Sequence, residues 1–504
     1  MKYAFILITA ITLFFLSCGG GGGSSSQPQN NTPDVNTSHD TNTTDTNATT
    51  SQSMRLIVTV PALTPDDEFI CLGFNDANPA LKMQTLGTNR WQIDINESSF
   101  DSTQYKYCRN CECDAADESF DDANQSWRML AFQKATTQED NVTAWRWLSA
   151  NLLHISLDTT DYQTTPPNNT KTDFFAGVML NDWWKHEWID SIDTTMKKIT
   201  QDTNATWIQY APVPEITQLY PTPIIKAVAA NGTSDADLLA IIKSAHTHGL
   251  KVFLNPSPWA FDADSSPEDH NQTWWNDFRD QWKPIMLHYA QIAQDNDVEM
   301  LEFKMWPNID AINDNEKAKM NDLASGLLDD VKSVYTGKIA VQSICYDVDR
   351  PLLDAQRNGD YLAVNIWSYY PWHLGDTKDD NVSSIYNHID ADLDACKNYY
   401  DNNSISKPVI IEQLAAASYD GAIIGAVEND EDIDSFHENN DSYTLDLQEQ
   451  ADVYEATLHA ISQKDWIEGN YAFTYFYWDS VGKDINIRAK PAQNVIAKWY
   501  GWMR

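Results

Sequence analysis

The sequence predicts an α/β protein, in which a small all-β sandwich precedes a (β/α)8 TIM barrel. Two patterns carry this prediction. Between residues 170 and 504, apolar runs of strand length alternate eight times with stretches of helical periodicity, which is typical of a barrel of βα units. Between residues 54 and 150, short alternating segments are separated by Pro, Asn, Asp or Gly turns, which is typical of a β-sandwich.

The eight barrel strands are expected in apolar segments. In chain order these read FFAGVMLN, ATWIQYAPV, LKVFLNP, VEMLEFKMWP, KIAVQSI, YLAVNIWSYYP, KPVIIEQ and NYAFTYFYWD. The helix before the third strand is expected to have Ser234 as its N-cap and to stop at Gly249. A doubly wound open sheet is the alternative, but no Gly-rich phosphate loop follows the first strand.

The N-terminal segment is expected to be a targeting signal followed by a linker. Residues 1–18 contain one Lys, an apolar run and then Leu16-Ser17-Cys18, which resembles a bacterial lipoprotein signal. The resemblance implies cleavage before Cys18 and lipidation of that residue, and hence an exported protein at the outer membrane or cell surface. An ordinary secretory signal is the alternative. Residues 19–53 are Gly, Ser, Thr, Asn and Asp with almost nothing apolar, and predict a disordered linker.

The composition favours carbohydrate over nucleic acid as a partner. The chain has 73 Asp and Glu against 34 Lys and Arg, a formal net charge of −39, so phosphate backbones should be repelled. Its 19 Trp residues offer large flat surfaces that suit stacking on sugar rings. The simpler interpretation of the acidity is that it keeps an exported protein soluble.

The cysteines predict disulfides rather than a metal site. Six cysteines follow Cys18, and three of them lie in CRNCEC at residues 108–113. A structural zinc site would need a second Cys or His pair at matching spacing, and only Cys71 lies near. One or two disulfides are therefore expected in the first domain, with a pairing that the sequence does not determine.

Three segments of the first domain resemble the starch-binding, family 20 carbohydrate-binding modules. They are LIVTVPALTPDDEFICLGF, GTNRWQIDI with Trp91, and YKYCRN. The resemblance implies stacking of sugars on exposed Trp side chains. The candidates are Trp127, Trp145 and Trp147, whereas Trp91 is expected in the core. Core packing or contact with the barrel is the alternative for all of them.

The ends of the predicted barrel strands carry carboxylates and aromatic rings, and in such barrels the chemistry lies at these ends. The candidates are Asp182, Glu215, Trp259, Trp306, Tyr369, Tyr370, Glu412, Trp478 and Asp479. Aromatic rings suit pyranose stacking, and two carboxylates suffice to break a glycosidic bond, so no cofactor or metal is expected. Glu412, at the end of the seventh strand, is predicted to be catalytic. Its alternative role is to support a neighbouring side chain or to cap a helix.

The barrel resembles glycoside hydrolase family 113, which contains β-mannanase-like retaining enzymes. The matching segments are FFAGVML, SDADLLAIIKSAHTHGLKVFLNPSP, YLAVNIWSYYP, KPVIIEQ, and WIEGNYAFTYFYWD with KPAQNVIAKWYGW, together covering roughly residues 174–502. The resemblance implies that Glu412 is the nucleophile. It also implies that the Tyr at 369 or 370 contacts Glu412, and that Trp478 forms the floor of a sugar subsite.

The fourth strand departs from the family pattern. The family's acid/base Glu ends this strand in Gly-Thr-Glu, whereas VEMLEFKMWPN places Lys304 at the Gly and Trp306 at the Glu. Glu302 is the obvious substitute and points to the same side of the strand, but it is expected roughly 13 Å deeper in the barrel. A buried Glu302–Lys304 ion pair is the preferred interpretation. Asp182, Glu215 and Asp479 stay open as other proton donors.

The predicted function is a surface-anchored glycoside hydrolase that cleaves a β-linked, mannan-like polysaccharide by a retaining mechanism, with Glu412 as nucleophile and Glu302 as the second candidate catalytic residue. One alternative is a barrel that has lost hydrolysis and binds glycan. The other is a surface adhesin that uses both domains as lectins and does not need Glu412.

Overall fold

The fold was analysed in a computed structural model of the chain. It describes residues 53–75, 79–96, 102–117, 127–132, 136–145, 155–167, 171, 173–180, 184–228, 232–258, 270–305, 313–344, 352–367, 374–424, 444–475 and 483–503. The expected signal, with Cys18, and nearly all of the expected linker lie outside these residues.

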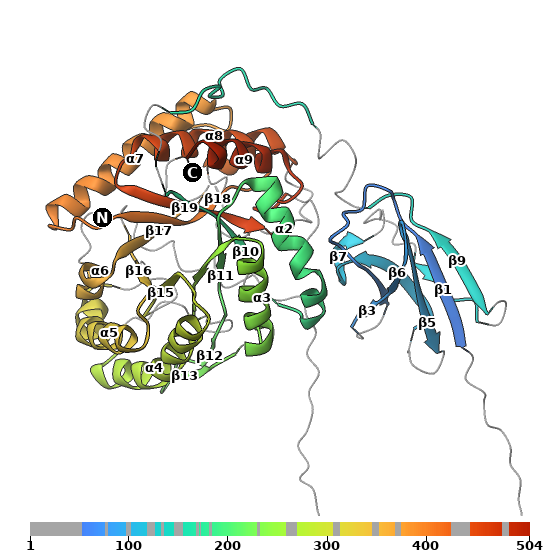
Figure 1. The fold of residues 1–504 in the computed structure, drawn as a ribbon, viewed down its shortest axis with the longest axis horizontal. Helices are drawn as coiled ribbons and strands as arrows, with labels where there is room; N and C mark the ends of the chain where they lie inside the picture. Colours follow the sequence, from blue (N-terminus) through green and yellow to red (C-terminus); the bar gives the residue numbers. More distant parts are fainter. Residues whose placement is uncertain are drawn as a thin grey trace, which may run out of the picture.

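Eight parallel strands close into a barrel in chain order, which confirms the predicted fold class (Figure 1). They are β10 (Phe175–Leu180), β11 (Trp207–Tyr210), β14 (Lys251–Leu254), β15 (Met300–Phe303), β16 (Lys338–Gln342), β17 (Tyr361–Trp367), β18 (Val409–Ala415) and β19 (Ile467–Tyr475). A two-stranded hairpin, β12 (Glu215–Gln218) and β13 (Ile224–Lys226), follows β11. All eight predicted strand segments thus overlap a barrel strand, although β18 extends beyond its segment at the carboxyl end and β19 begins before its segment.

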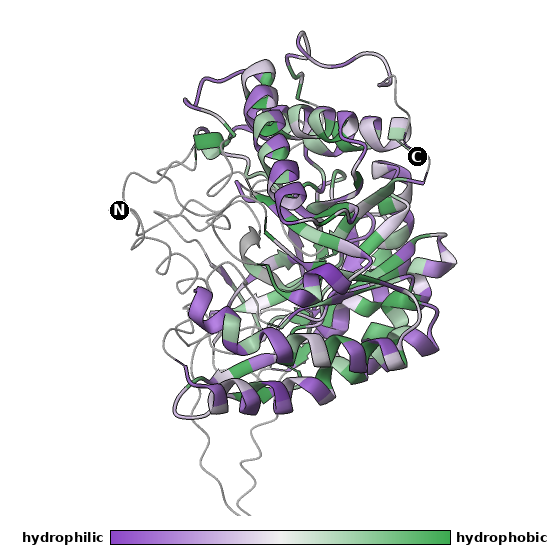
Figure 2. Cartoon of the chain, turned by 90° about the vertical axis from the view of Figure 1, so that its left-hand side faces the viewer, coloured by the Kyte–Doolittle hydropathy of each residue, from purple (hydrophilic) through white to green (hydrophobic). Residues whose placement is uncertain are grey.

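Helices surround the barrel. They are η2 (His186–Ser191), α2 (Ile192–Thr203), α3 (Asp235–Thr247), α4 (Gln272–Asp295), α5 (Asp314–Val334), α6 (Asp354–Asn358), α7 (Val382–Asn402), η4 (Ala422–Ile424), α8 (Leu447–Gln463) and α9 (Pro491–Met503). The predicted limits of α3 are confirmed: Ser234 accepts a hydrogen bond from the backbone of Asp237, and Gly249 has φ +76°. The helices have one polar and one apolar side, and the apolar side faces the strands (Figure 2).

The barrel interior changes character along its axis. Nine buried, mostly aromatic side chains fill its N-terminal part: Phe175, Trp207, Phe253, Met300, Ala340, Tyr361, Ala363, Ile410 and Tyr471. Two residues further along β11, β15 and β18, and just beyond β14, the buried side chains become polar: Gln209, Glu302, Glu412 and Asn255. Side chains two positions apart on a strand share a face, so these polar groups lie in the next interior layer, toward the carboxyl ends of the strands.

The N-terminal domain consists of two sheets, one ordered β4-β5-β1-β9 and the other β3-β2-β6-β7, with β8 paired to β6. The strands are β1 (Ser53–Thr59), β2 (Ile70–Phe74), β3 (Leu81–Lys82), β4 (Gln84–Gly87), β5 (Arg90–Asn96), β6 (Gln104–Arg109), β7 (Glu112–Asp117), β8 (Arg128–Met129) and β9 (Thr137–Asn141). Apolar side chains from both sheets, such as Leu56, Leu72 and Tyr107, form one core, as in a sandwich.

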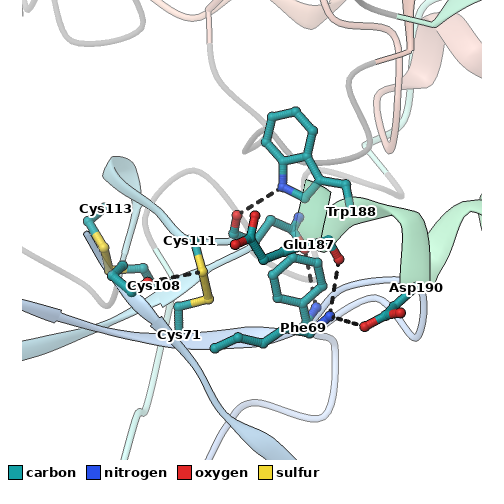
Figure 3. Close-up of a disulfide and its surroundings, with 11 residues drawn as sticks. Phe69, Cys71, Cys108, Cys111, Cys113, Glu187, Trp188 and Asp190 are labelled. Carbon is teal, nitrogen blue, oxygen red and sulfur yellow. Dashed lines mark hydrogen bonds and ion pairs between the residues drawn. A yellow bond between two sulfur atoms is a disulfide. The ribbon is translucent and has the colours of Figure 1, made fainter. Parts of the chain in front are cut away.

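Two disulfides connect the four cysteines of this domain: Cys71–Cys111 and Cys108–Cys113 (Figure 3). The first links β2 to the turn between β6 and β7, and the second closes that turn. The prediction of disulfides in the first domain is confirmed, and CRNCEC is not a metal site.

The sandwich packs against the barrel next to η2 and α2 (Figure 1). Beside the Cys71–Cys111 disulfide, the Trp188 indole donates a hydrogen bond to the backbone carbonyl of Asn110, at 3.2 Å. The Lys82 ammonium lies 2.9 Å from Asp190 and also donates to the Glu187 carbonyl (Figure 3). The two domains are therefore joined by specific polar contacts as well as by the chain.

Buried charges strengthen this interface. Arg488, which follows β19 in the chain, donates to Asp67 at 2.8 Å and to Glu68 at 2.7 Å, and Arg109 of the sandwich contacts Glu68 at 3.2 Å. All four side chains are buried. We call Asp67, Glu68, Arg109 and Arg488 the interface cluster.

Membrane-spanning helices were sought in the described part of the chain. None of its helices combines the length and the hydrophobicity that crossing a bilayer requires.

Candidate active site

Glu412 occupies a β-bulge in the interior of β18. In β17, Val364 pairs with Ile411 and the next residue, Asn365, pairs with Gln413, so Glu412 has no partner on that side. The pairing with β19 also shifts between Ile411 and Leu414. The strand continues to Ala415, so the prediction that Glu412 ends it is wrong. Bulges redirect side chains and are common beside active sites, and this one allows the strand to continue past Glu412.

A single lysine connects the two candidate catalytic carboxylates. The Lys304 ammonium lies 3.1 Å from Glu302 Oε1 and 3.6 Å from Glu412 Oε2. The side chains of Glu302 and Glu412 are fully buried, and that of Lys304 is 4% exposed. We call these three residues the barrel cluster. The predicted contact between Glu302 and Lys304 inside the barrel is confirmed, and Glu412 is the third member of the group.

The expected depth difference between Glu302 and the site is wrong. The carboxylates of Glu302 and Glu412 touch the same ammonium, so they are not separated by the roughly 13 Å that counting along one strand gave. β15 ends at Phe303, earlier than predicted, so Glu302 is already near the carboxyl end of its strand. Because barrel strands are tilted and staggered, it can lie level with Glu412 in the middle of β18. The bulge at Glu412 also changes the count along β18.

Neutral groups complete the surroundings of the cluster. Asn255, just after β14, donates its amide to Glu412 Oε2 at 3.4 Å, and the Trp282 indole donates to the Lys304 backbone carbonyl at 2.8 Å. Within the described residues, neither Glu302 oxygen nor Glu412 Oε1 has a well-aligned hydrogen-bond donor. Buried acceptors with spare capacity are uncommon and point to a functional site.

Burial and neighbouring charges shift two pKa values in the cluster. Burial raises the pKa of Glu302 well above its usual value, the negative charge of Glu412 adds to this, and Lys304 opposes it. Burial alone would lower the pKa of Lys304, but the charges of Glu302 and Glu412 outweigh it and raise that pKa. Glu302 therefore keeps its proton to a higher pH than an ordinary glutamate, and Lys304 keeps its charge to a higher pH than an ordinary lysine.

The other predicted barrel residues are not brought into this cluster by the described part of the chain. Glu215 lies on β12 of the hairpin, beyond the end of β11 at Tyr210, and its carboxylate is 3.3 Å from the Lys226 ammonium. Its expected position at a barrel strand end is wrong, because the chain leaves the barrel before residue 215. The remaining candidates lie outside the described residues: Asp182, Trp259, Trp306, Tyr369, Tyr370, Trp478 and Asp479.

The sandwich gives little support to the predicted sugar-stacking residues. Trp145 is 3% exposed and its indole donates to Thr64, so it is a core residue and the prediction is wrong. Trp127 is half-buried, with the Lys106 ammonium 5.1 Å from its ring centroid. Trp91 is partly buried and packs against the cores of both domains. Trp147 lies outside the described residues.

Sequence reasoning missed one exposed aromatic ring on the side of the barrel where the strands end. Tyr220, in the β12–β13 hairpin, is 59% exposed, and its ring stacks on that of His270 with centroids 5.0 Å apart. His270 in turn stacks on Trp274, at 3.8 Å. Tyr220 therefore has a defined orientation, although it follows no predicted strand directly.

A further group of charged side chains has a structural role. Asp420, Asp446 and Glu449 lie close enough to hold a metal ion, but Glu449 already accepts backbone hydrogen bonds from Gly421 and Ile423. Burial raises the pKa of Glu449 to about 7, which further weakens it as a ligand.

A cavity of about 560 Å³ opens at the opposite, N-terminal end of the barrel. Lys171 lines it and donates to the backbone carbonyls of Ile461, Lys464 and Ile467, and burial lowers its pKa to about 8. Lys171 thus binds backbone carbonyls at the C-terminal end of α8 and at the start of β19, which is a structural role. Because chemistry in such barrels lies at the opposite, C-terminal face, the cavity is not a catalytic site.

Comparisons with known proteins identify a family and a similar fold. Residues 181–496 match the model of Glycoside Hydrolase Family 113. A GH113 β-1,4-mannanase solved as a complex is 18% identical, with a TM-score of 0.51, over 66% of this chain and 99% of that one. A GH113 β-mannanase from Alicyclobacillus acidocaldarius is 17% identical over the same shares, with a TM-score of 0.49. Among curated proteins, none matches the chain significantly.

Proposed function

Since the chain belongs to glycoside hydrolase family 113, and is therefore a glycoside hydrolase of β-linked polysaccharide, we propose that it cleaves a mannan-like glycan by a retaining mechanism. In this proposal Glu412 is the nucleophile and Glu302 is the proton donor. One observation carries it: carboxyl groups from β15 and β18 meet at one ammonium, and burial raises the pKa of one of them, Glu302. Pairs whose environments separate their pKa values are typical of acid/base sites.

The two carboxyl groups have complementary tasks in a retaining reaction. A carboxylate attacks the anomeric carbon while a protonated carboxyl, about 5–5.5 Å away, donates its proton to the leaving oxygen. The same carboxyl then takes a proton from the water that hydrolyses the glycosyl-enzyme. Both groups are fully buried, so the sugar has to displace neighbouring side chains to reach them.

The proposed substrate is a neutral β-linked polysaccharide of the mannan type. The structurally similar proteins are titled β-mannanases, and the formal net charge of −39 disfavours anionic glycans. The exposed ring of Tyr220 offers a flat apolar surface of the kind that stacks on a pyranose.

The test is the release of reducing sugar from mannan, glucomannan, xylan, β-glucan and starch. We expect activity on the mannans, and a loss on the order of 10³-fold or more in Glu412→Ala, since the nucleophile is removed. Glu449→Gln is the matched control, because it changes a buried glutamate that accepts hydrogen bonds from the backbone of Gly421 and Ile423 and should retain activity.

Two results would contradict the proposal. One is equal turnover by the wild type and Glu412→Ala. The other is the absence of turnover on every substrate with glycan binding retained, which would indicate a barrel that binds without cutting.

We also propose that the protein is exported and anchored through a lipid on Cys18, on the strength of the N-terminal sequence alone. Metabolic labelling with a fatty acid should mark the wild type and leave Cys18→Ala unlabelled. Equal labelling of both would refute the anchor.

A further inference from the structure

We propose that Lys304 is the positioning residue of the catalytic pair: its ammonium stabilises Glu412 as the carboxylate and leaves the single proton of the pair on Glu302. The inference rests on the proposed function, because it concerns the same two carboxyl groups. It assigns a role to Lys304, which the predicted register of the fourth strand aligns with a glycine of the family pattern.

The position of Lys304 is well defined by its contacts. It directly follows β15, and its backbone carbonyl accepts the Trp282 hydrogen bond from α4, at 2.8 Å. Its ammonium reaches across the barrel interior to β18, where it lies 3.6 Å from Glu412 Oε2. In the described part of the chain, the charged groups that act on it are Glu302 on its own strand and Glu412 on β18.

Charge balance explains why one proton belongs to the cluster. With both carboxyl groups ionised, the buried cluster would carry a net negative charge in a poorly solvated place, which is costly. One proton makes it neutral. Lys304 keeps its charge because two carboxyl groups face it, so the proton resides on a carboxyl group.

Two observations bear on which carboxyl group holds the proton, and they point in opposite directions. Lys304 lies nearer to Glu302, at 3.1 Å, which favours ionised Glu302. Glu412 Oε2, however, faces both Lys304 and the Asn255 amide, and the hydrogen bond between the two carboxyl groups raises the pKa of Glu302, as expected when Glu302 is its donor. Hydrogen bonds to the charged form favour ionisation, so we assign the charge to Glu412 and the proton to Glu302.

The alternative is that Lys304 only stabilises the fold by neutralising buried charge. The two roles differ in the pH dependence of the reaction. If Lys304 favours the Glu412 carboxylate, its removal must raise the pH at which the nucleophile becomes active, because a nearby positive charge lowers the pKa of a carboxyl group by about 1–3 units. A purely stabilising lysine would alter the free energy of unfolding and leave this pH unchanged.

The decisive experiment compares pH profiles of kcat/KM for the wild type, Lys304→Met, Lys304→Arg and Lys171→Met, since the acidic limb reports the free enzyme. In Lys304→Met we expect the limb to move up by about 1–3 pH units. Lys304→Arg keeps the positive charge, so its acidic limb should lie at the same pH as that of the wild type. Lys171→Met removes a buried lysine at the other end of the barrel, so it should lower stability with the limb unchanged.

If the acidic limb of the kcat/KM profile lies at the same pH in Lys304→Met as in the wild type, the proposal is overturned. It is also overturned if the acidic limb of Lys304→Arg shifts as far as that of Lys304→Met.

A second measurement does not depend on turnover or on the folding of Lys304→Met. Infrared spectroscopy of the wild type at neutral pH should show the carbonyl band of a buried protonated carboxyl group. Glu302→Gln should remove this band, because Lys304 and the remaining Glu412 carboxylate are then balanced without a proton. Persistence of this band in Glu302→Gln, beyond the contribution that Glu449→Gln removes, would refute the single proton of the pair. If the wild type cleaves no glycan, the proposed reaction fails, while the infrared result still decides whether the cluster holds a proton.

Discussion

The interface cluster and the barrel cluster are both buried groups of charges, but they are built differently. In the interface cluster, two arginines face two carboxylates, Lys198 adds a third cation 3.4 Å from Asp67, and Arg488 makes two hydrogen bonds of 2.7 and 2.8 Å. In the barrel cluster, one lysine faces two carboxyl groups at 3.1 and 3.6 Å. Three carboxyl oxygens there have no well-aligned donor, against one, Asp67 Oδ2, in the interface cluster.

The difference separates a structural role from a chemical one. A cluster whose cations match its carboxylates is neutral without a proton, and the interface cluster stabilises the contact between the sandwich and the barrel. A cluster with one cation and two carboxyl groups is neutral only when it binds a proton, and that proton can be transferred to a substrate. Burial alone therefore does not distinguish the two clusters; the ratio of cations to carboxyl groups does.

The largest effect on stability is expected when the interface cluster is broken. Arg488→Met leaves Asp67 and Glu68 buried with less compensation, and removing one partner of a buried ion pair costs about 3–5 kcal/mol. Urea denaturation should show this loss in the free energy of unfolding, with the acidic limb of the activity profile unchanged.

The control for that change is an exposed arginine. Arg55 pairs with Asp94 at 2.7 Å on the surface of the sandwich, and such exposed pairs contribute about 0–1 kcal/mol. Arg55→Met should therefore have a small effect. If Arg488→Met costs no more than Arg55→Met, the interface cluster does not stabilise the domain contact.

A smaller effect, dependent on pH, is expected in the barrel cluster. Burial and Glu412 raise the pKa of Glu302, so above the usual Glu pKa of about 4.3 the folded protein keeps a proton that the unfolded chain has lost. This contribution to stability decreases as the pH rises toward the raised pKa. Glu302→Gln cannot ionise and removes it, so the variant should gain stability relative to the wild type as the pH increases.

Unfolding free energies of the wild type and Glu302→Gln, measured from pH 5 to pH 8, test this directly. Glu449, whose pKa is about 7, adds its own pH dependence to both proteins, and this cancels in the difference. A difference that does not change with pH would mean that Glu302 is ionised throughout, and that the two clusters are not distinguished by a proton.

Local patterns were sufficient for much of the fold. The eight strand segments, the capping serine at Ser234 and the stop at Gly249 could all be identified, because apolar runs, caps and left-handed turns depend on neighbouring residues. The disulfides of the sandwich were also expected, but their pairing was not, because it depends on how β2 meets the β6–β7 turn.

Arrangements across the barrel could not be derived in the same way. Glu215 was expected at a strand end and lies in a hairpin, because nothing local marks where β11 leaves the sheet. Trp145 was expected to bind sugar and is buried, because a tryptophan fits a core as well as a surface.

The sequence by itself determined the barrel, the preceding sandwich, the family and the candidate carboxylates Glu302 and Glu412. Only the tertiary structure decided that Lys304 joins these two carboxylates and that Arg488 ties the barrel to the sandwich. The physical reason is that periodicity and caps act within one element. Strand tilt, the bulge at Glu412 and the closure of the barrel instead set distances between residues more than a hundred positions apart.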